Sequence, residues 1–204
     1  MNLNKLIPGI ILLAAGAILP TSATAEIAGL QNGRSADLNN LPDSSIELGI
    51  NFGDIDDFDY QYLGARYNYR LSPQLMAYAD LGTMKIEDTD EIGFGIGAFY
   101  MLQDVLANAD TAVKFSYHTV GGDIDVNAIA LEAIVSGRNG LGSNPDLQWY
   151  GNFGISRLSG NGNSDTELLF GGGVVHPTQS GEVMVGLDHI DGLLFRIGYR
   201  HFLQ

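Results

Sequence analysis

The chain has 204 residues, of which 24 are acidic and 10 are basic, and its formal net charge is −14. This excess of acid excludes nucleic acid as a partner, because phosphate binding needs clustered lysine and arginine. The sequence contains no cysteine, so disulfide bonds do not stabilise the fold.

Residues 1–25 have the three parts of a secretory signal peptide. Lys5 supplies the positive end, residues 10–19 form a short apolar run, and Ala23 and Ala25 frame a small-residue cleavage pattern. The segment therefore predicts export followed by cleavage.

The next segment, 26–43, is polar and has no periodicity, so we expect a flexible periplasmic leader. Beyond the signal peptide, no apolar run approaches the roughly 20 residues that a helix needs to cross a bilayer. Any membrane insertion of the mature chain would therefore use strands.

From Ser44 onward, apolar and polar residues alternate with a period of two, and turn signals return at regular intervals. This pattern is typical of antiparallel strands. We predict ten of them, at 44–53, 60–70, 75–85, 91–101, 109–119, 124–136, 146–157, 166–175, 181–188 and 193–202. An eight-stranded alternative requires two of these segments to be merged or discarded.

One face of each predicted strand is apolar, and the other carries glycine, asparagine and isolated charges. In the last strand, Phe195, Ile197 and Tyr199 alternate with Arg196 and Gly198. A soluble sandwich would place a lysine- and glutamate-rich face outside. The fold class predicted for residues 44–204 is therefore all-β, an antiparallel up-and-down transmembrane β-barrel with its apolar face toward lipid.

Aromatic residues on the apolar face gather near the strand ends, as expected where amphipathic rings meet lipid headgroups. The predicted girdle consists of Phe52, Tyr67, Tyr69, Tyr100, Tyr117, Trp149 and Tyr199.

The opposite face places three acids and three bases at mid-strand. Buried charges are tolerated only when they are paired, so we expect a network that occludes the lumen, with a narrow ion path as the alternative. Its predicted members are Glu47, Arg66, Asp80, Lys114, Glu132 and Arg196.

The connections assigned to one end of the barrel are rich in acidic residues, which we interpret mainly as solvated loops. The alternative is divalent-cation binding by Asp54, Asp56 and Asp59, although these residues do not fit an EF-hand loop. We predict no metal site and no cofactor.

The signal peptide, the glycine-rich alternating strands and the closing run from Phe195 to Arg200 resemble the small outer-membrane β-barrels of Gram-negative bacteria. The resemblance implies an outer-membrane location, contact with outer-membrane lipid and lipopolysaccharide, and assembly by the barrel assembly machinery. Members of that group usually end on an aromatic residue that the assembly machinery reads. This chain departs from the pattern by adding His201, Leu203 and Gln204 near its end.

These features predict a structural or narrow-channel barrel without enzymatic activity. One alternative is an outer-membrane lipid hydrolase using Ser116 and His118, which share a strand face. Lipid-A deacylases of this architecture use a histidine and a serine at that spacing, but in the opposite order. The other alternative is a soluble periplasmic β-barrel that carries a small ligand.

Overall fold

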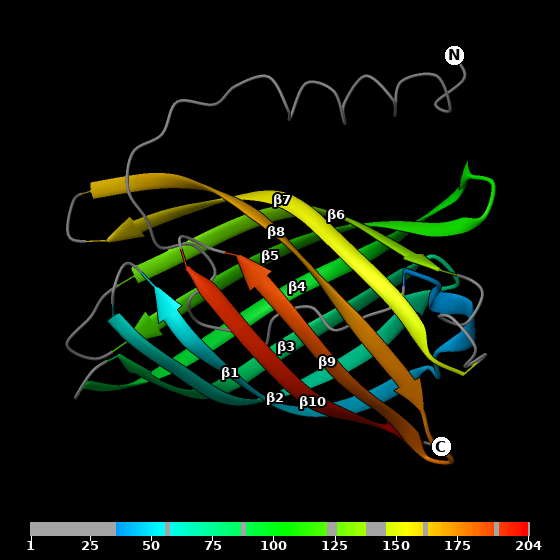
Figure 1. The fold of residues 1–204 in the computed structure, drawn as a ribbon, viewed down its shortest axis with the longest axis horizontal. Helices are drawn as coiled ribbons and strands as arrows, with labels where there is room; N and C mark the ends of the chain where they lie inside the picture. The colour runs from blue at the N-terminus through cyan, green and yellow to red at the C-terminus, as the bar shows by residue number, and fades with distance from the viewer. Residues whose placement is uncertain are drawn as a thin grey trace.

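In the computed structural model of the protein, the described residues are 36–55, 58–86, 89–121, 126–137, 146–160, 163–189 and 192–203. The predicted signal peptide and the first part of the leader lie outside them. The described residues form ten antiparallel strands in one closed barrel (Figure 1). The strands are β1 (Ser44–Ile55), β2 (Phe58–Ser72), β3 (Leu75–Ile86), β4 (Thr89–Leu106), β5 (Ala109–Gly121), β6 (Val126–Gly137), β7 (Gln148–Gly160), β8 (Asn163–Pro177), β9 (Gly181–His189) and β10 (Leu193–Leu203).

The first and last strands close the barrel by pairing with each other, from Ser44 opposite Leu203 to Gly53 opposite Leu194. Every other strand pairs with its neighbours in sequence, which makes the topology up-and-down. Closure gives both edges of the sheet a hydrogen-bonding partner. The prediction of ten strands is confirmed, and the eight-stranded alternative is wrong.

Strand β4 extends further than predicted, to Leu106 instead of residue 101. Its pairing with β5 shifts register between Leu102 and Leu106, and Asp104 has a positive φ of 54°. Aspartate tolerates this left-handed conformation better than most residues do. Residues 102–106, beyond the predicted end of the strand, thus form an irregular extension of the hairpin.

The predicted alternation of faces is also confirmed. Leu48 on β1 is 58% exposed on the outer surface, whereas the adjacent Glu47 is 1% exposed and faces the lumen. Among the described residues, we find no helix with the length and apolar character needed to cross a membrane.

The barrel has an inner end, where β1 begins and β10 ends, and an outer end, where β1 connects to β2 (Figure 1). Near the outer end of the barrel, the lumen is lined by apolar side chains instead of the polar ones expected from the sequence. We call them the outer apolar cluster, after the end of the barrel at which they lie inside the lumen. This cluster consists of Tyr60, Tyr62, Met84, Val120, Ala128, Ala130, Leu158, Leu169 and Leu194.

Residues 36–43 differ from the flexible leader expected from the sequence. They include a short 3-10 helix, η2 (Leu38–Asn40), and they pack inside the inner end of the barrel. Leu38 is completely buried, because it and its apolar neighbours Ala36 and Leu41 fit against apolar side chains of the wall. We call residues 36–43 the plug.

Candidate functional site

Charged side chains form a belt inside the barrel, between the outer apolar cluster and the plug. The strand register explains why they meet. Arg66 is paired with Glu47 on β1 and with Asp80 on β3, while Lys114 on β5 is paired with Glu132 on β6. All five side chains face the lumen and are at most 2% exposed. The belt is defined as Glu47, Arg66, Asp80, Lys114, His118, Glu132, Glu182, Asp188, Arg196 and Arg200.

Arg66 and Asp80 form the first pair of the belt. The arginine donates from Nε to Oδ1 at 2.5 Å and from Nη2 to Oδ2 at 2.7 Å, a bidentate geometry. The guanidinium also lies 4.1 Å from the ring centroid of Tyr78. His118 Nε2 lies 3.0 Å from Asp80 Oδ2, so one carboxylate serves two neighbouring side chains.

Lys114 and Glu132 form the second pair, with Nζ 2.7 Å from Oε1. The other carboxylate oxygen of Glu132 accepts a hydrogen bond of 3.1 Å from Asn152 Nδ2. Both oxygens of this buried carboxylate are therefore bonded, which offsets its loss of hydration.

The remaining arginines come from β10. Arg200 donates to Glu47 Oε2 from Nη2 at 2.8 Å and from Nε at 3.2 Å, and its Nη1 donates to Glu182. Arg196 Nη1 lies 2.9 Å from Asp188 Oδ2, and Arg196 Nη2 donates to the Tyr150 hydroxyl. The belt therefore joins strands from both ends of the chain.

Four members of the belt were absent from the predicted network, namely His118, Glu182, Asp188 and Arg200. Asp188 lies next to one of the acidic connections, but it is 2% exposed and faces the lumen. The alternation of faces along β9 would have predicted this position, because Asp188 lies on the same face of the strand as Glu182. Arg200 likewise shares a face of β10 with Arg196.

Glycine residues in the barrel wall leave room for aromatic and imidazole side chains that point into the lumen. A Cβ added at Gly95 would lie 1.9 Å from His118 Cδ2 and 2.4 Å from His118 Nε2. The ring thus occupies the space that any larger residue at this position would need. Gly151, by contrast, is on the outer face, and an added Cβ there would have its nearest neighbour at 3.7 Å.

We therefore expect Gly95→Ala to destabilise the barrel by about 1–3 kcal/mol, because the ring must leave its contact with Asp80. Urea unfolding monitored by gel mobility of unheated samples measures the change. Gly151→Ala is the matched control and should be neutral or slightly stabilising. The double variant Gly95→Ala/His118→Ala should be less destabilised than the sum of its single variants. Equal stability of Gly95→Ala and Gly151→Ala would contradict the contact.

Ser116 and His118, the residues of the hydrolase alternative, lie two positions apart on the lumen face of β5. They are 0% and 1% exposed, and His118 contacts Asp80 from β3, not an acid of an outer loop. Among the described residues, the ring nitrogen Nδ1 of His118 has no hydrogen-bond partner.

Two of the three aspartates considered as cation ligands lie within the described residues. Asp54 on β1 is paired with Asp59 on β2, and both are exposed. Asp56 lies outside the described residues. Within the described part of the chain, no group of three or more metal-ligating side chains is present.

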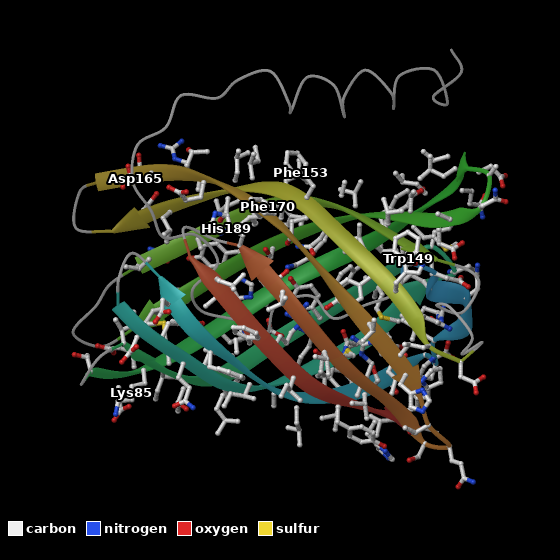
Figure 2. The ribbon with its side chains drawn as sticks, in the orientation of Figure 1. Lys85, Trp149, Phe153, Asp165, Phe170 and His189 are labelled. Carbon is white, nitrogen blue, oxygen red and sulfur yellow. The ribbon has the colours of Figure 1, made fainter. Side chains whose placement is uncertain are left out.

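All seven predicted girdle residues lie on the outer face. Tyr67, Tyr69 and Tyr100 are 47–50% exposed toward the inner end, and Phe52 near the outer end stacks on Phe195 with ring centroids 5.7 Å apart. The other three, Tyr117, Trp149 and Tyr199, are half-buried on the same face. Figure 2 shows Trp149 near the inner end of β7.

The sequence matches no protein-family model and no curated protein. Solved structures do show a likeness. A KdgM porin is 10% identical with a TM-score of 0.43, covering 78% of this chain and 99% of its own. LpxR from Salmonella typhimurium is 10% identical with a TM-score of 0.46, covering 80% and 86%. A NanC porin is 11% identical with a TM-score of 0.40, covering 79% and 100%.

At such low identities and TM-scores, these likenesses assign no function to the chain. The architecture of the chain, a closed antiparallel barrel of ten strands, rests on its own strand pairing and assigns it to no subfamily.

Proposed function

We propose that the protein is an integral outer-membrane β-barrel whose lumen is closed, with a structural role and at most a narrow path for ions. The observation that carries this proposal is the filling of the lumen by three successive layers. These layers are the outer apolar cluster, the charged belt and the plug with its apolar surroundings. A ten-stranded barrel filled in this way differs from large porins, which keep an aqueous channel.

The outer surface supports lipid as the surrounding solvent. Leu63, Leu81 and Ile92 are 59–63% exposed, and they belong to a continuous apolar face of the barrel. Soluble monomers rarely expose contiguous apolar patches of such extent. The same surface disfavours the soluble ligand carrier, which would also need its interior for the ligand.

The strand lengths agree with this proposal, since about 9–11 residues of a tilted strand cross the hydrocarbon core. The shortest strand, β9, has 9 residues and the longest, β4, has 18. Contact with outer-membrane lipid and lipopolysaccharide, and assembly through the closing strand β10, belong to the same proposal.

The geometry also supports a non-enzymatic role. A lipid hydrolase needs its nucleophile and base at a surface that lipid reaches, whereas Ser116 and His118 face the lumen and are buried. Asp80 is bound to Arg66 as well as to His118, as expected for a member of an ion-pair network.

Conductance in a planar bilayer tests closure of the lumen. We expect the refolded wild-type protein to give no steady current of the size that an open porin gives under the same conditions. Folding is checked separately by the different gel mobility of heated and unheated samples, because a closed barrel resists unfolding in detergent. A steady, porin-sized current from inserted wild-type protein would overturn the closed lumen.

A further inference from the structure

The three layers that fill the lumen are attached to the barrel in different ways. The belt residues belong to the strands themselves, and ion pairs join side chains that are at most 7% exposed, such as Arg200 with Glu47 and Glu182. The plug is joined to the barrel covalently only where Asp43 leads into β1. The plug is therefore the layer that can leave without breaking the sheet.

Arg70 makes the main polar contacts to the plug. Its Nη2 donates to the carbonyl oxygens of both Leu38 and Leu41. Its Nε lies 3.3 Å from Asp43 Oδ1, and its backbone N–H donates to the Asp43 carbonyl at 2.7 Å. One guanidinium thus binds the Leu41 carbonyl, just past the end of the short helix η2, and the Leu38 carbonyl, which also accepts from the Leu41 N–H at 3.2 Å.

Other contacts also join the plug to the wall. Ala36 N–H donates to Ser136 Oγ at 2.8 Å, Asn39 Nδ2 donates to Met101 Sδ at 3.7 Å, and Leu38 packs in an apolar cluster. The wall of that cluster is formed by Met76, Tyr78, Phe99, Met101, Ala112 and Ile134. Burial of apolar side chains and hydrogen bonds hold the plug, and its ion pair with Arg70 involves Asp43, whose side chain is 91% exposed.

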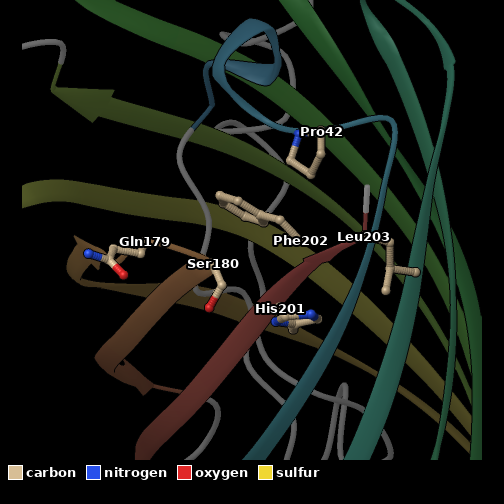
Figure 3. A pocket seen from close by; sticks show the side chains of 6 residues that line it. All are labelled: Pro42, Gln179, Ser180, His201, Phe202 and Leu203. Atoms are coloured by element: carbon tan, nitrogen blue, oxygen red, sulfur yellow. The ribbon is translucent and has the colours of Figure 1, made fainter.

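The last part of the plug, just before β1, also borders open space. Pro42 borders a cavity of about 580 Å³ at the inner rim (Figure 3). The other residues that line it are Gln179, Ser180, His201, Phe202 and Leu203, from the β8–β9 turn and the end of β10.

We propose that residues 36–43 are a removable plug that closes the inner end of the lumen, latched by Arg70 to the carbonyls of Leu38 and Leu41. Release of the latch exposes an apolar chamber between the inner rim and the belt, while the ion pairs of the belt stay intact. The proposal does not depend on conductance or on the surrounding lipid.

The absence of cysteine from the chain makes a single introduced thiol a clean reporter. Leu38→Cys places it at a completely buried position, and Asn39→Cys places it at an exposed position of the same helix. In the folded protein in detergent, a water-soluble maleimide should label Leu38→Cys much more slowly than Asn39→Cys. Similar rates for the two would overturn docking of the plug.

Arg70→Ala in the Leu38→Cys background tests the latch. We expect labelling to become about tenfold faster, since two hydrogen bonds to a charged donor are lost. The matched control is Arg157→Ala, which removes an exposed arginine that donates to Ser164 Oγ at 3.2 Å far from the plug. An unchanged labelling rate in Arg70→Ala would overturn the latch.

Gel mobility of unheated samples verifies that each variant keeps a closed barrel. If Arg70→Ala does not fold, Arg70→Lys replaces it, because lysine keeps the charge but lacks the planar fork that reaches two carbonyls. The thiol of Leu38→Cys should then be labelled faster in the Arg70→Lys variant than in the protein that keeps Arg70. Equal rates in the two proteins would contradict the latch. If Arg70→Ala leaves the labelling rate unchanged but the wild-type protein gives no porin-sized current, the latch is wrong and the proposed function is unaffected.

Discussion

Arg200→Met should destabilise the barrel by about 3–5 kcal/mol or prevent its refolding, because it leaves two buried carboxylates without their shared cation. Glu47 and Glu182 are 1% and 5% exposed, and Arg200 binds both. Methionine retains much of the side-chain volume, so the loss of charge dominates over the loss of packing. The midpoint of urea unfolding, read from the gel mobility of unheated samples, gives the change.

Two further variants identify the cause of that loss. Arg157→Met removes an exposed arginine and should change the free energy of unfolding by less than about 0.5 kcal/mol. The triple variant Arg200→Met/Glu47→Gln/Glu182→Gln removes the unpaired charges and should recover a large part of the lost stability. If Arg200→Met is as stable as the wild type, the belt does not hold the barrel as the geometry indicates.

The strands were predictable because alternation is a local property. A strand with one apolar and one polar face shows its period within a few residues, as the run of Phe195, Arg196 and Ile197 does. The same parity puts Glu47, Asp80 and Arg196 on one face of their strands, and all three are at most 2% exposed.

The partners within the lumen were less predictable, because they depend on the register of closure. Arg200 and Glu47 are 153 positions apart in sequence, and only the pairing of β10 with β1 brings them together. Asp188 was left out of the predicted network for a different reason. It is the last residue of its predicted strand and lies beside the acidic connection that follows, whereas β9 continues to His189.

The plug and the outer apolar cluster were missed for different reasons. Residues 36–43 show no periodicity, and Leu38 and Leu41 acquire a partner surface only when the barrel has closed around them. In the outer cluster, Met84 and Leu158 occupy the polar face of otherwise alternating strands. The assumption that this face is polar along its whole length concealed the apolar layer.

The variant Ile197→Arg should also lose much folding free energy, because lipid surrounds the outer face of the barrel. Ile197 is 49% exposed on β10, between Ile50 on β1 and Val185 on β9. In a bilayer, an arginine in the middle of the apolar band should cost about 2–4 kcal/mol of folding free energy. In water, the same substitution at an exposed site should change the stability by less than about 0.5 kcal/mol.

The comparison requires that the variant be refolded into lipid vesicles, with the free energy of unfolding measured in urea. Gln179→Arg is the matched control, since it introduces the same side chain in the exposed turn between β8 and β9 and should be nearly neutral. The difference between the two arginines isolates the cost of desolvating the charge, because both variants keep the ion pairs of the belt. Equal stabilities would mean that water surrounds Ile197, and the outer face would then belong to a soluble barrel.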